Sequence, residues 1–401
     1  MTYDFDTVIS RKKTASLKWD VKDNELPMWV ADMDFKTAPE IINDLEDRVA
    51  HGIFGYSIIE DEWYDAYISW WKKRHDFTIE KEWLIFCTGV IPAISSTVRK
   101  LTSPNEKVVI QTPVYNVFFN CIFNNGCRVL QNELIYEDGE YRMDFEDLEQ
   151  KLSDPQTTLM ILCNPQNPSG KIWDKDTLKR VGKLCVKYNV AVISDEIHCD
   201  IVTPGKKYVP FASVSTECRA CSITCIAPTK AFNLAGLHSA AVFIPNPYLR
   251  HKIWRALNTD EVAEPNAFAI TAAVSAFTKG EPWLDALNRY IDDNRKITED
   301  YIDENIPMIK TVRGEATYLI WLDIKEITSK LSKCIDTKKL SRFVAQYVRE
   351  KTGLFVTEGD EYGDAGEGFL RINVACPKSM LKDGLERLEN GIDMLVKEYD
   401  L

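Results

Sequence analysis

The sequence lacks the features that would assign the protein to a membrane or to nucleic acid. It contains no apolar run near the roughly 20 residues that a membrane-spanning helix requires. Residues 1–13 lack the hydrophobic stretch of a secretion signal. Basic residues are outnumbered, with 49 lysines and arginines against 61 aspartates and glutamates. This acidic balance disfavours DNA, RNA or an anionic membrane as a partner, and we expect a cytoplasmic protein.

Paired cysteines are also missing. The eleven cysteines are scattered, and Cys218 and Cys221 form the only CxxC motif, with no second pair to complete a metal site. An odd number of cysteines, together with the lack of an export signal, argues against a disulfide framework. We therefore expect free cysteines that pack as small core residues, and no bound metal.

No repeat, low-complexity tract or flexible linker divides the sequence, but its 401 residues are too many for one simple core. Between about residues 85 and 245, short apolar runs alternate with amphipathic helical segments. This pattern predicts an α/β fold with a mostly parallel central sheet and helices on both faces. We expect a large domain over residues 41–280 and a smaller α+β domain formed by residues 1–40 and 281–401. The apolar runs lie at residues 108–110, 159–162, 190–193, 223–226 and 240–244.

Chemically distinctive residues follow the predicted strands. Sites in such sheets lie at the carboxyl ends of the strands. Gly89 lies between a strand and a helix, Tyr115 follows the run at 108–110, and Asn167 lies in an Asn-Pro-Gln-Asn-Pro turn. Asp195 ends the run at 190–193, and Lys230 follows the run at 223–226. We expect these five residues to meet at one edge of the sheet.

Three of them suggest a specific chemistry. The backbone N–H groups after Gly89 could hold a phosphate, although glycines at helix starts are common. Asp195 at the end of a buried strand needs a cationic partner. Lys230 lies among small and apolar residues, which favours an amine with a lowered pKa. For Tyr115, simple core packing is the alternative interpretation.

The order and spacing of these residues resemble fold-type I pyridoxal-phosphate enzymes of the aspartate aminotransferase superfamily. Asn167 and Asp195 are 28 residues apart, and Asp195 and Lys230 are 35 apart. The resemblance implies that Lys230 binds pyridoxal phosphate covalently, that Asp195 pairs with the pyridine nitrogen and that Asn167 hydrogen-bonds the phenolic oxygen. It also implies that Arg371, in the segment Arg371-Ile-Asn373, binds the carboxylate of an amino-acid substrate.

Longer motifs resemble the MalY/PatB branch, the cystathionine and cysteine-conjugate β-lyases that include cystalysin. This resemblance implies a carbon–sulfur β-lyase that converts cystathionine, cysteine or S-substituted cysteines to pyruvate, ammonia and a thiol. The motifs are Pro27-Met-Trp-Val-Ala-Asp-Met-Asp-Phe35, Gly55-Tyr56, Asp195-Glu-Ile-His198, Lys230-Ala-Phe-Asn-Leu-Ala-Gly236 and Thr317-Tyr-Leu-Ile-Trp-Leu-Asp323.

The branch implies further site residues. Tyr56 would reach across a homodimer interface to the phosphate of the neighbouring subunit. Tyr115 would stack on the cofactor ring and take part in catalysis, and His198 would contact the cofactor. The remaining phosphate ligands would be Gly89, Val90 and Thr229, and the substrate would contact Ala31, Asn167 and Tyr115 besides Arg371.

Three positions depart from the related patterns. Ala227 replaces a phosphate-binding serine of many aminotransferases, and His238 replaces an arginine. Asn116 stands where cystalysin-like proteins have a second tyrosine, so the substrate preference stays open. Two alternatives also stay open. An aminotransferase would share the same residues, and an enzyme of this branch could have an added regulatory role through a protein partner.

Overall fold

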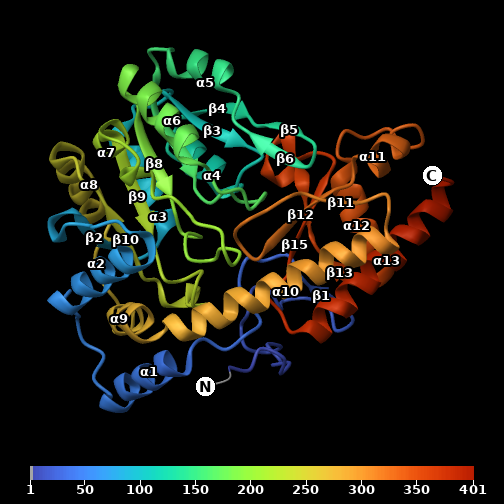
Figure 1. Cartoon of the computed structure of the whole chain (residues 1–401), viewed down its shortest axis with the longest axis horizontal. Coiled ribbons are helices and arrows are strands. Elements are labelled where there is room, and N and C mark those ends of the chain that lie inside the picture. Colours follow the sequence, from blue (N-terminus) through green and yellow to red (C-terminus); the bar gives the residue numbers. More distant parts are fainter. Residues whose placement is uncertain (1–2) are drawn as a thin grey trace.

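A seven-stranded sheet forms the centre of the protein in the computed structural model, which describes residues 3–401 (Figure 1). Its strand order is β2-β10-β9-β8-β7-β3-β4. The neighbours from β9 to β4 run parallel, and only β10 is antiparallel to both of its neighbours. The predicted mostly parallel sheet is therefore confirmed. The strands are β2 (Leu84–Cys87), β3 (Lys107–Thr112), β4 (Arg128–Glu133), β7 (Thr157–Cys163), β8 (Ala191–Asp195), β9 (Ser222–Ile226) and β10 (Ala240–Phe243).

Helices cover both faces of this sheet. Alternate strand residues point to opposite faces, so Val108 and Ile110 pack in one core and Val109 packs in another. The first core contains α3 (Val90–Leu101), α4 (Val117–Phe123) and α8 (Pro247–Thr259). The second contains α5 (Phe145–Leu152), α6 (Lys175–Lys187) and α7 (Thr216–Cys221). Burial on both faces explains why these strands are continuously apolar in sequence.

A smaller sheet of order β11-β12-β15-β14 is antiparallel throughout. Helix α10 (Glu281–Asn305) runs from beside α9 (Ala269–Lys279) to this second part (Figure 1). Strand β1 (Leu26–Pro27) pairs with β13 (Leu354–Phe355), so an N-terminal segment belongs to this second part of the chain. The other elements are β5 (Ile135–Glu137), β6 (Glu140–Arg142), β11 (Lys310–Thr311), β12 (Leu319–Asp323), β14 (Thr357–Glu358), β15 (Phe369–Asn373), α11 (Lys325–Leu331), α12 (Leu340–Thr352) and α13 (Lys378–Tyr399).

The N-terminal segment packs against both parts of the chain. Phe5, Met33 and Phe35 belong to the core around α2 (Asp61–His75), whereas Leu26 and Met28 belong to the core of the smaller sheet. The domain boundaries near residues 41 and 281 therefore stay a prediction. Within residues 3–401, no helix combines the length and the apolar character that crossing a membrane requires.

Helix α1 (Pro39–His51) has an apolar face that is only partly covered. Ile41 is buried, whereas Val49 is 55% exposed. Further exposed apolar side chains follow in the connection to α2, namely Ile53, Phe54, Tyr56 and Ile58. All eleven cysteines lie within the described chain and are free, and only Cys334 is exposed, which agrees with cysteines used for packing.

Candidate active site

The loops that follow the parallel strands meet at one edge of the large sheet. Cys163, Asp195 and Cys225 are directly paired across β7, β8 and β9, which places the ends of these strands level with one another. The Asn167 loop follows β7, and the Lys230 loop follows β9. Asn167 and Lys230 therefore reach the same space as Asp195.

A cavity of about 190 Å³ occupies this space. It is lined by nine of the residues that the sequence predicts for the site: Ala31, Gly89, Val90, Tyr115, Asn167, Asp195, His198, Thr229 and Lys230. Arg371 lies beside it, because its guanidinium Nη1 donates to Asn167 Oδ1 at 3.2 Å. Tyr56 does not line the cavity within one chain and is fully exposed.

The Lys230 amine is held by a backbone carbonyl. Its Nζ donates to the carbonyl oxygen of Ala31 at 2.5 Å. Burial, as the larger cause, and the nearby cation of Arg371 lower the pKa of Lys230 to about 8 against the opposing effects of Asp32 and Asp195. A larger fraction of this amine than of an ordinary lysine is therefore unprotonated near neutral pH, as a nucleophile or a base requires.

Asp195 is a buried carboxylate with a single hydrogen-bond donor. Among residues 3–401, only the backbone N–H of Ile197 donates to it, at 3.1 Å. Burial raises the pKa of Asp195 to about 6, and this N–H and the charge of Lys230 limit the rise. A protonated ring nitrogen in the cavity would supply the missing partner and favour the ionised form.

Arg371 is a buried cation without an acidic partner in the part of the chain that the structure describes. It is 5% exposed, and its Nη2 donates to the carbonyl oxygen of Trp29 at 2.7 Å. Its Nε atom has no partner among the same residues. A buried guanidinium in this state can hold a ligand carboxylate by two parallel hydrogen bonds.

His198 is a neutral ring that faces the cavity. Burial lowers its pKa to about 3, and Lys230 and Arg371 add to the effect. Its Nδ1 atom is buried and finds no hydrogen-bond partner within the described chain. The ring of Tyr318 lies edge-on, with the two ring centroids 6.1 Å apart. His198 can therefore form a hydrogen bond with a ligand without adding a charge to the cavity.

The N-terminus of α3 also faces the cavity. Thr88, Gly89 and Val90 line it, and Gly89 precedes the first turn of this helix. The first N–H groups of a helix have no partner within the helix, and the helix dipole favours an anion there. This end of the cavity suits a phosphate group.

Sequence reasoning overlooked two residues at this end of the cavity. It treated His238 only as a departure from related patterns, yet His238 lines the cavity and so does the adjacent Ser239. Their position two and three residues after the motif that ends at Gly236 was the available signal. The carbonyl contacts from residues 29–31 were also missed, because backbone groups carry no sequence signature.

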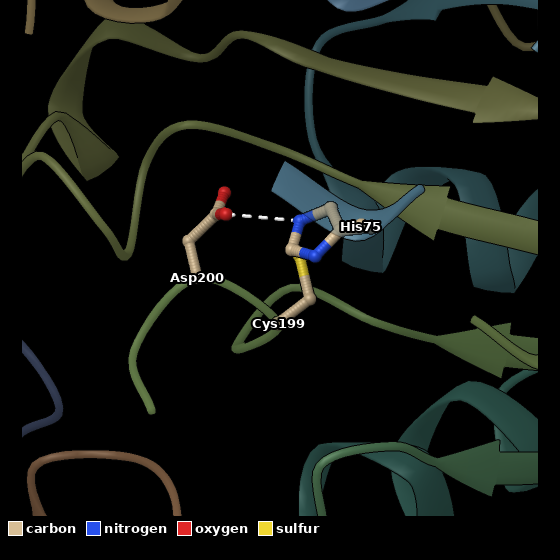
Figure 2. Close-up of side chains that lie close together, drawn as sticks. All are labelled: His75, Cys199 and Asp200. Carbon is tan, nitrogen blue, oxygen red and sulfur yellow. Dashed lines mark hydrogen bonds and ion pairs between the residues drawn. The ribbon is translucent and has the colours of Figure 1, made fainter. Parts of the chain in front are cut away.

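Away from this cavity, His75, Cys199 and Asp200 lie close together and include atom types that bind metals (Figure 2). His75 Nε2 lies 3.0 Å from Asp200 Oδ1, and Trp70 Nε1 donates to both Asp200 oxygens at 3.1 and 3.0 Å. Burial raises the pKa of the Cys199 thiol well above its usual value, which opposes a thiolate ligand. Hydrogen bonding accounts for this cluster, and the predicted absence of a metal stays a prediction.

Comparisons with known proteins agree along nearly the whole chain. Residues 27–388 match the family described as aminotransferase class I and II. The chain is 41% identical to cystathionine β-lyase PatB of Bacillus subtilis strain 168, over 96% of this chain and 98% of that protein. Its structure is similar to a pyridoxal-phosphate-bound putative aminotransferase from Clostridium difficile 630, with a TM-score of 0.92, 38% identity and 98% and 100% of the two chains covered. Cystalysin from Treponema denticola, which contains pyridoxal 5'-phosphate, gives a TM-score of 0.91 at 34% identity and the same coverage.

Proposed function

The chain belongs to the class I and II aminotransferase family, and on this basis we propose that it is a pyridoxal-phosphate-dependent carbon–sulfur β-lyase. Its substrates are cystathionine, cysteine or S-substituted cysteines, and its products are pyruvate, ammonia and a thiol. The likeness to PatB and cystalysin confirms the predicted MalY/PatB branch. The convergence of Lys230, Asp195 and Arg371 at one cavity supports the use of pyridoxal phosphate, and the likeness to PatB and cystalysin is the observation that carries the lyase activity.

The residues of the cavity fit pyridoxal phosphate. Among residues 3–401, Asp195 lacks a cationic partner at hydrogen-bonding distance and His198 Nδ1 lacks any hydrogen-bond partner, and the start of α3 suits a phosphate. These groups would hold the pyridine nitrogen, the ring and the phosphate, together with Asn167, Val90 and Thr229. When bound, the cofactor supplies a sink for the electron pair that remains when the substrate loses its Cα proton.

Lys230 is the proposed base for that proton. Its amine is partly unprotonated near neutral pH, because burial and Arg371 lower its pKa to about 8. The Ala31 carbonyl fixes the direction of one N–H, which leaves the nitrogen lone pair free to accept a proton from the cavity. Lys230 also anchors the cofactor covalently in this proposal.

Arg371 binds the α-carboxylate of the substrate in the proposed reaction. A carboxylate can bind while the contact with the Trp29 carbonyl is kept, because a guanidinium has five N–H donors and Arg371 Nε has no partner among residues 3–401. Asn167, which accepts a hydrogen bond from Arg371, would also contact the cofactor, and Tyr115 would stack on its ring. The carboxylate and the Cα proton are then presented to Arg371 and Lys230 at the same time.

A homodimer with shared sites also belongs to the proposal. Tyr56 is fully exposed and lies among the exposed apolar side chains Val49, Ile53, Phe54 and Ile58. A second copy of the chain would bury this patch and would bring Tyr56 to the phosphate end of the neighbouring cavity. A cytoplasmic location is part of the same proposal, since ten of the eleven free cysteines are buried.

The test is a pyruvate and thiol assay with cystathionine and a panel of cysteine S-conjugates, without any ketoacid. A β-lyase releases both products in equal amounts under these conditions. A protein that forms product only after a ketoacid is added would be an aminotransferase, and the lyase proposal would fail. The likeness to a putative aminotransferase makes this the necessary comparison.

A further inference from the structure

Residues 29–35, which we call the strap, lie against both Lys230 and Arg371. Two carbonyl groups of the strap point toward these side chains. The Trp29 oxygen accepts from Arg371 Nη2 at 2.7 Å, and the Ala31 oxygen accepts from Lys230 Nζ at 2.5 Å. The hydroxyl of Tyr318 also donates to the Ala31 oxygen, at 2.9 Å. The strap therefore contacts the proposed base and the proposed carboxylate-binding group directly.

The alternate carbonyls of the strap point to an asparagine on the Arg371 strand. The oxygens of Val30 and Asp32 both accept from Asn373 Nδ2 at 2.6 Å. The strap is bent here, because the Asp32 N–H donates to the Val30 oxygen at 2.9 Å. Asn373 follows Arg371 by two residues in β15. The strap and the carboxylate-binding strand are thus held in a defined register.

A second asparagine joins the strap to the Lys230 loop. Asn233 Oδ1 accepts from the Met33 N–H at 3.1 Å, and its Nδ2 donates to the oxygens of Met33 and Phe35 at 3.0 and 2.9 Å. Asn233 follows Lys230 by three residues. One short segment therefore connects the two loops that carry the proposed catalytic and substrate-binding groups.

A buried ion cluster holds the strap from its other side. Lys18 is 1% exposed, and its Nζ lies 2.6 Å from Asp34 Oδ2 and 3.3 Å from the Asp32 carbonyl oxygen. Asp34 also accepts from Arg11 at 2.9 Å and from Trp19 Nε1 at 2.8 Å. Arg11 binds both oxygens of Asp32, at 2.7 and 2.9 Å. None of these four charges touches the cavity in the described chain.

Stability alone does not explain why these charged side chains are buried together. A buried ion pair often stabilises a fold no better than apolar residues of similar volume. It does restrict the chain to one arrangement, because any displacement leaves a buried charge unpaired. Here the restricted segment is the one that contacts Lys230 and Arg371.

We propose that Lys18 is a positioning residue that acts through Asp34 and Asp32 to hold the strap, which in turn sets the Lys230 amine relative to the Arg371 guanidinium. This inference rests on the proposed function, because the two groups act on neighbouring atoms of one amino acid. The carboxylate carbon and Cα are joined by a single bond, so the spacing of their two partners must be accurate. Misplacement by about 1 Å can cost roughly 100-fold in rate.

The ion cluster also influences the charge of Lys230. The charged and titratable groups around this amine are Arg371, Asp32 and Asp195, with His198 and Tyr318 near them. Asp32 raises the pKa of Lys230, whereas Arg371 lowers it. Without the positive charge of Lys18, the negative charges of Asp32 and Asp34 are less compensated. Because negative charge nearby favours a protonated amine, the pKa of Lys230 should rise.

The test compares Lys18→Met with the conservative variant Lys18→Arg and with Lys107→Met as a matched control. Lys107 also pairs with an aspartate, Asp154, but at the end of β3 that is remote from the cavity. Three quantities are measured: bound pyridoxal phosphate per chain, exchange of the substrate Cα proton in deuterated water, and the pH dependence of Lys230 labelling by trinitrobenzenesulfonate in the apo-protein. Peptide mapping assigns the label to Lys230.

We expect Lys18→Met to bind the cofactor in full but to exchange the Cα proton about 100-fold more slowly. The Lys230 labelling curve should move to higher pH in this variant. Lys18→Arg should recover most of the exchange rate, and Lys107→Met should match the wild type in both measurements. Exchange and labelling do not depend on whether the reaction ends in elimination or transamination, so failure of the lyase proposal would leave this test intact.

Wild-type exchange and labelling in Lys18→Met would overturn the inference, as would an equal loss of Cα-proton exchange in Lys107→Met. If Lys18→Met does not fold, Arg11→Gln replaces it, because Arg11 is partly exposed and leaves the pair of Lys18 and Asp34 intact. This variant should slow the exchange about 10-fold, because it should displace the strap less than Lys18→Met does. Wild-type exchange and labelling in Arg11→Gln would then overturn the inference.

Discussion

Arg371 and Asn167 are joined by a hydrogen bond of 3.2 Å, although 204 residues separate them in sequence. Arg371 comes from the small antiparallel sheet and Asn167 from the loop after β7 of the large sheet. The bond therefore joins the proposed carboxylate-binding group to a proposed ligand of the cofactor. A change in the position of either side chain should therefore change the position of the other.

Replacing Arg371 by lysine should raise KM for amino-acid substrates and lower kcat/KM by about 10-fold to 100-fold. Lysine keeps the charge but cannot bind Asn167 and a carboxylate at once with a rigid fork. A lost charged hydrogen bond is worth roughly 1.5–3 kcal/mol, which gives this range. Steady-state kinetics with S-methylcysteine measure the effect, with the exposed Arg313→Lys as a control. An unchanged KM would remove Arg371 from substrate binding.

Asp195→Asn should lower turnover by at least about 10-fold while it preserves or increases the stability of the apo-protein. The loss of turnover follows because a neutral amide cannot keep the pyridine nitrogen protonated as a carboxylate does. A turnover loss of this size corresponds to about 1.4 kcal/mol in the barrier. Near-normal turnover in Asp195→Asn would show that the carboxylate has no part in the reaction.

The stability of the apo-protein should depend on pH through the same residue. Burial raises the pKa of Asp195 to about 6 from 3.8, so the folded state binds the proton more tightly than the unfolded state. The stabilisation is complete below pH 4 and is lost as the pH rises through 6, by roughly 3 kcal/mol at most. Urea unfolding of apo-protein between pH 4 and pH 8 should show this decline, and Asp195→Asn should show less of it. Parallel slopes in the two proteins would contradict the assignment.

Lys230 should be the residue that borohydride links to pyridoxal phosphate, and in the apo-protein its amine should titrate near pH 8. Burial and Arg371 both lower its pKa, so Arg371→Gln should move the titration upward. The rate of trinitrobenzenesulfonate labelling against pH, mapped to the Lys230 peptide, measures both values. A borohydride label on another lysine would overturn the residue assignment as a whole.

Mixed dimers should recover activity that neither parent variant has. Tyr56→Ala removes the contribution to the neighbouring site, and Lys230→Ala inactivates its own site, so one of the two sites in a hybrid is intact. The mixture should regain about a quarter of wild-type activity if subunits exchange freely and the dimer is obligate. A fully active monomer, measured by sedimentation with a parallel assay, would refute shared sites.

Much of the fold and site could be predicted from local patterns. Continuous apolar runs indicated strands buried on both faces, and Asn167, Asp195 and Lys230 follow three such runs. Parallel strands end at a common edge, so this order in sequence already implied proximity in space. Antiparallel β10 could not be distinguished from its neighbours, because a buried strand has the same composition in either direction. The exposure of Val49 could not be predicted either, since periodicity shows that a helix face is apolar but not what covers it.

The sequence by itself determined which side chains are available for the chemistry: an amine and an acid that follow apolar runs, and a guanidinium within a later strand. Only the tertiary structure decided how they are held. The contact of Lys230 with the Ala31 carbonyl spans 199 residues, and any residue type offers a carbonyl. Lys18 likewise has no pattern that distinguishes it from a solvated surface lysine until folding buries it beside Asp34. Side-chain identity is written in the sequence, whereas the positions of backbone groups and the pairing of distant charges arise from packing.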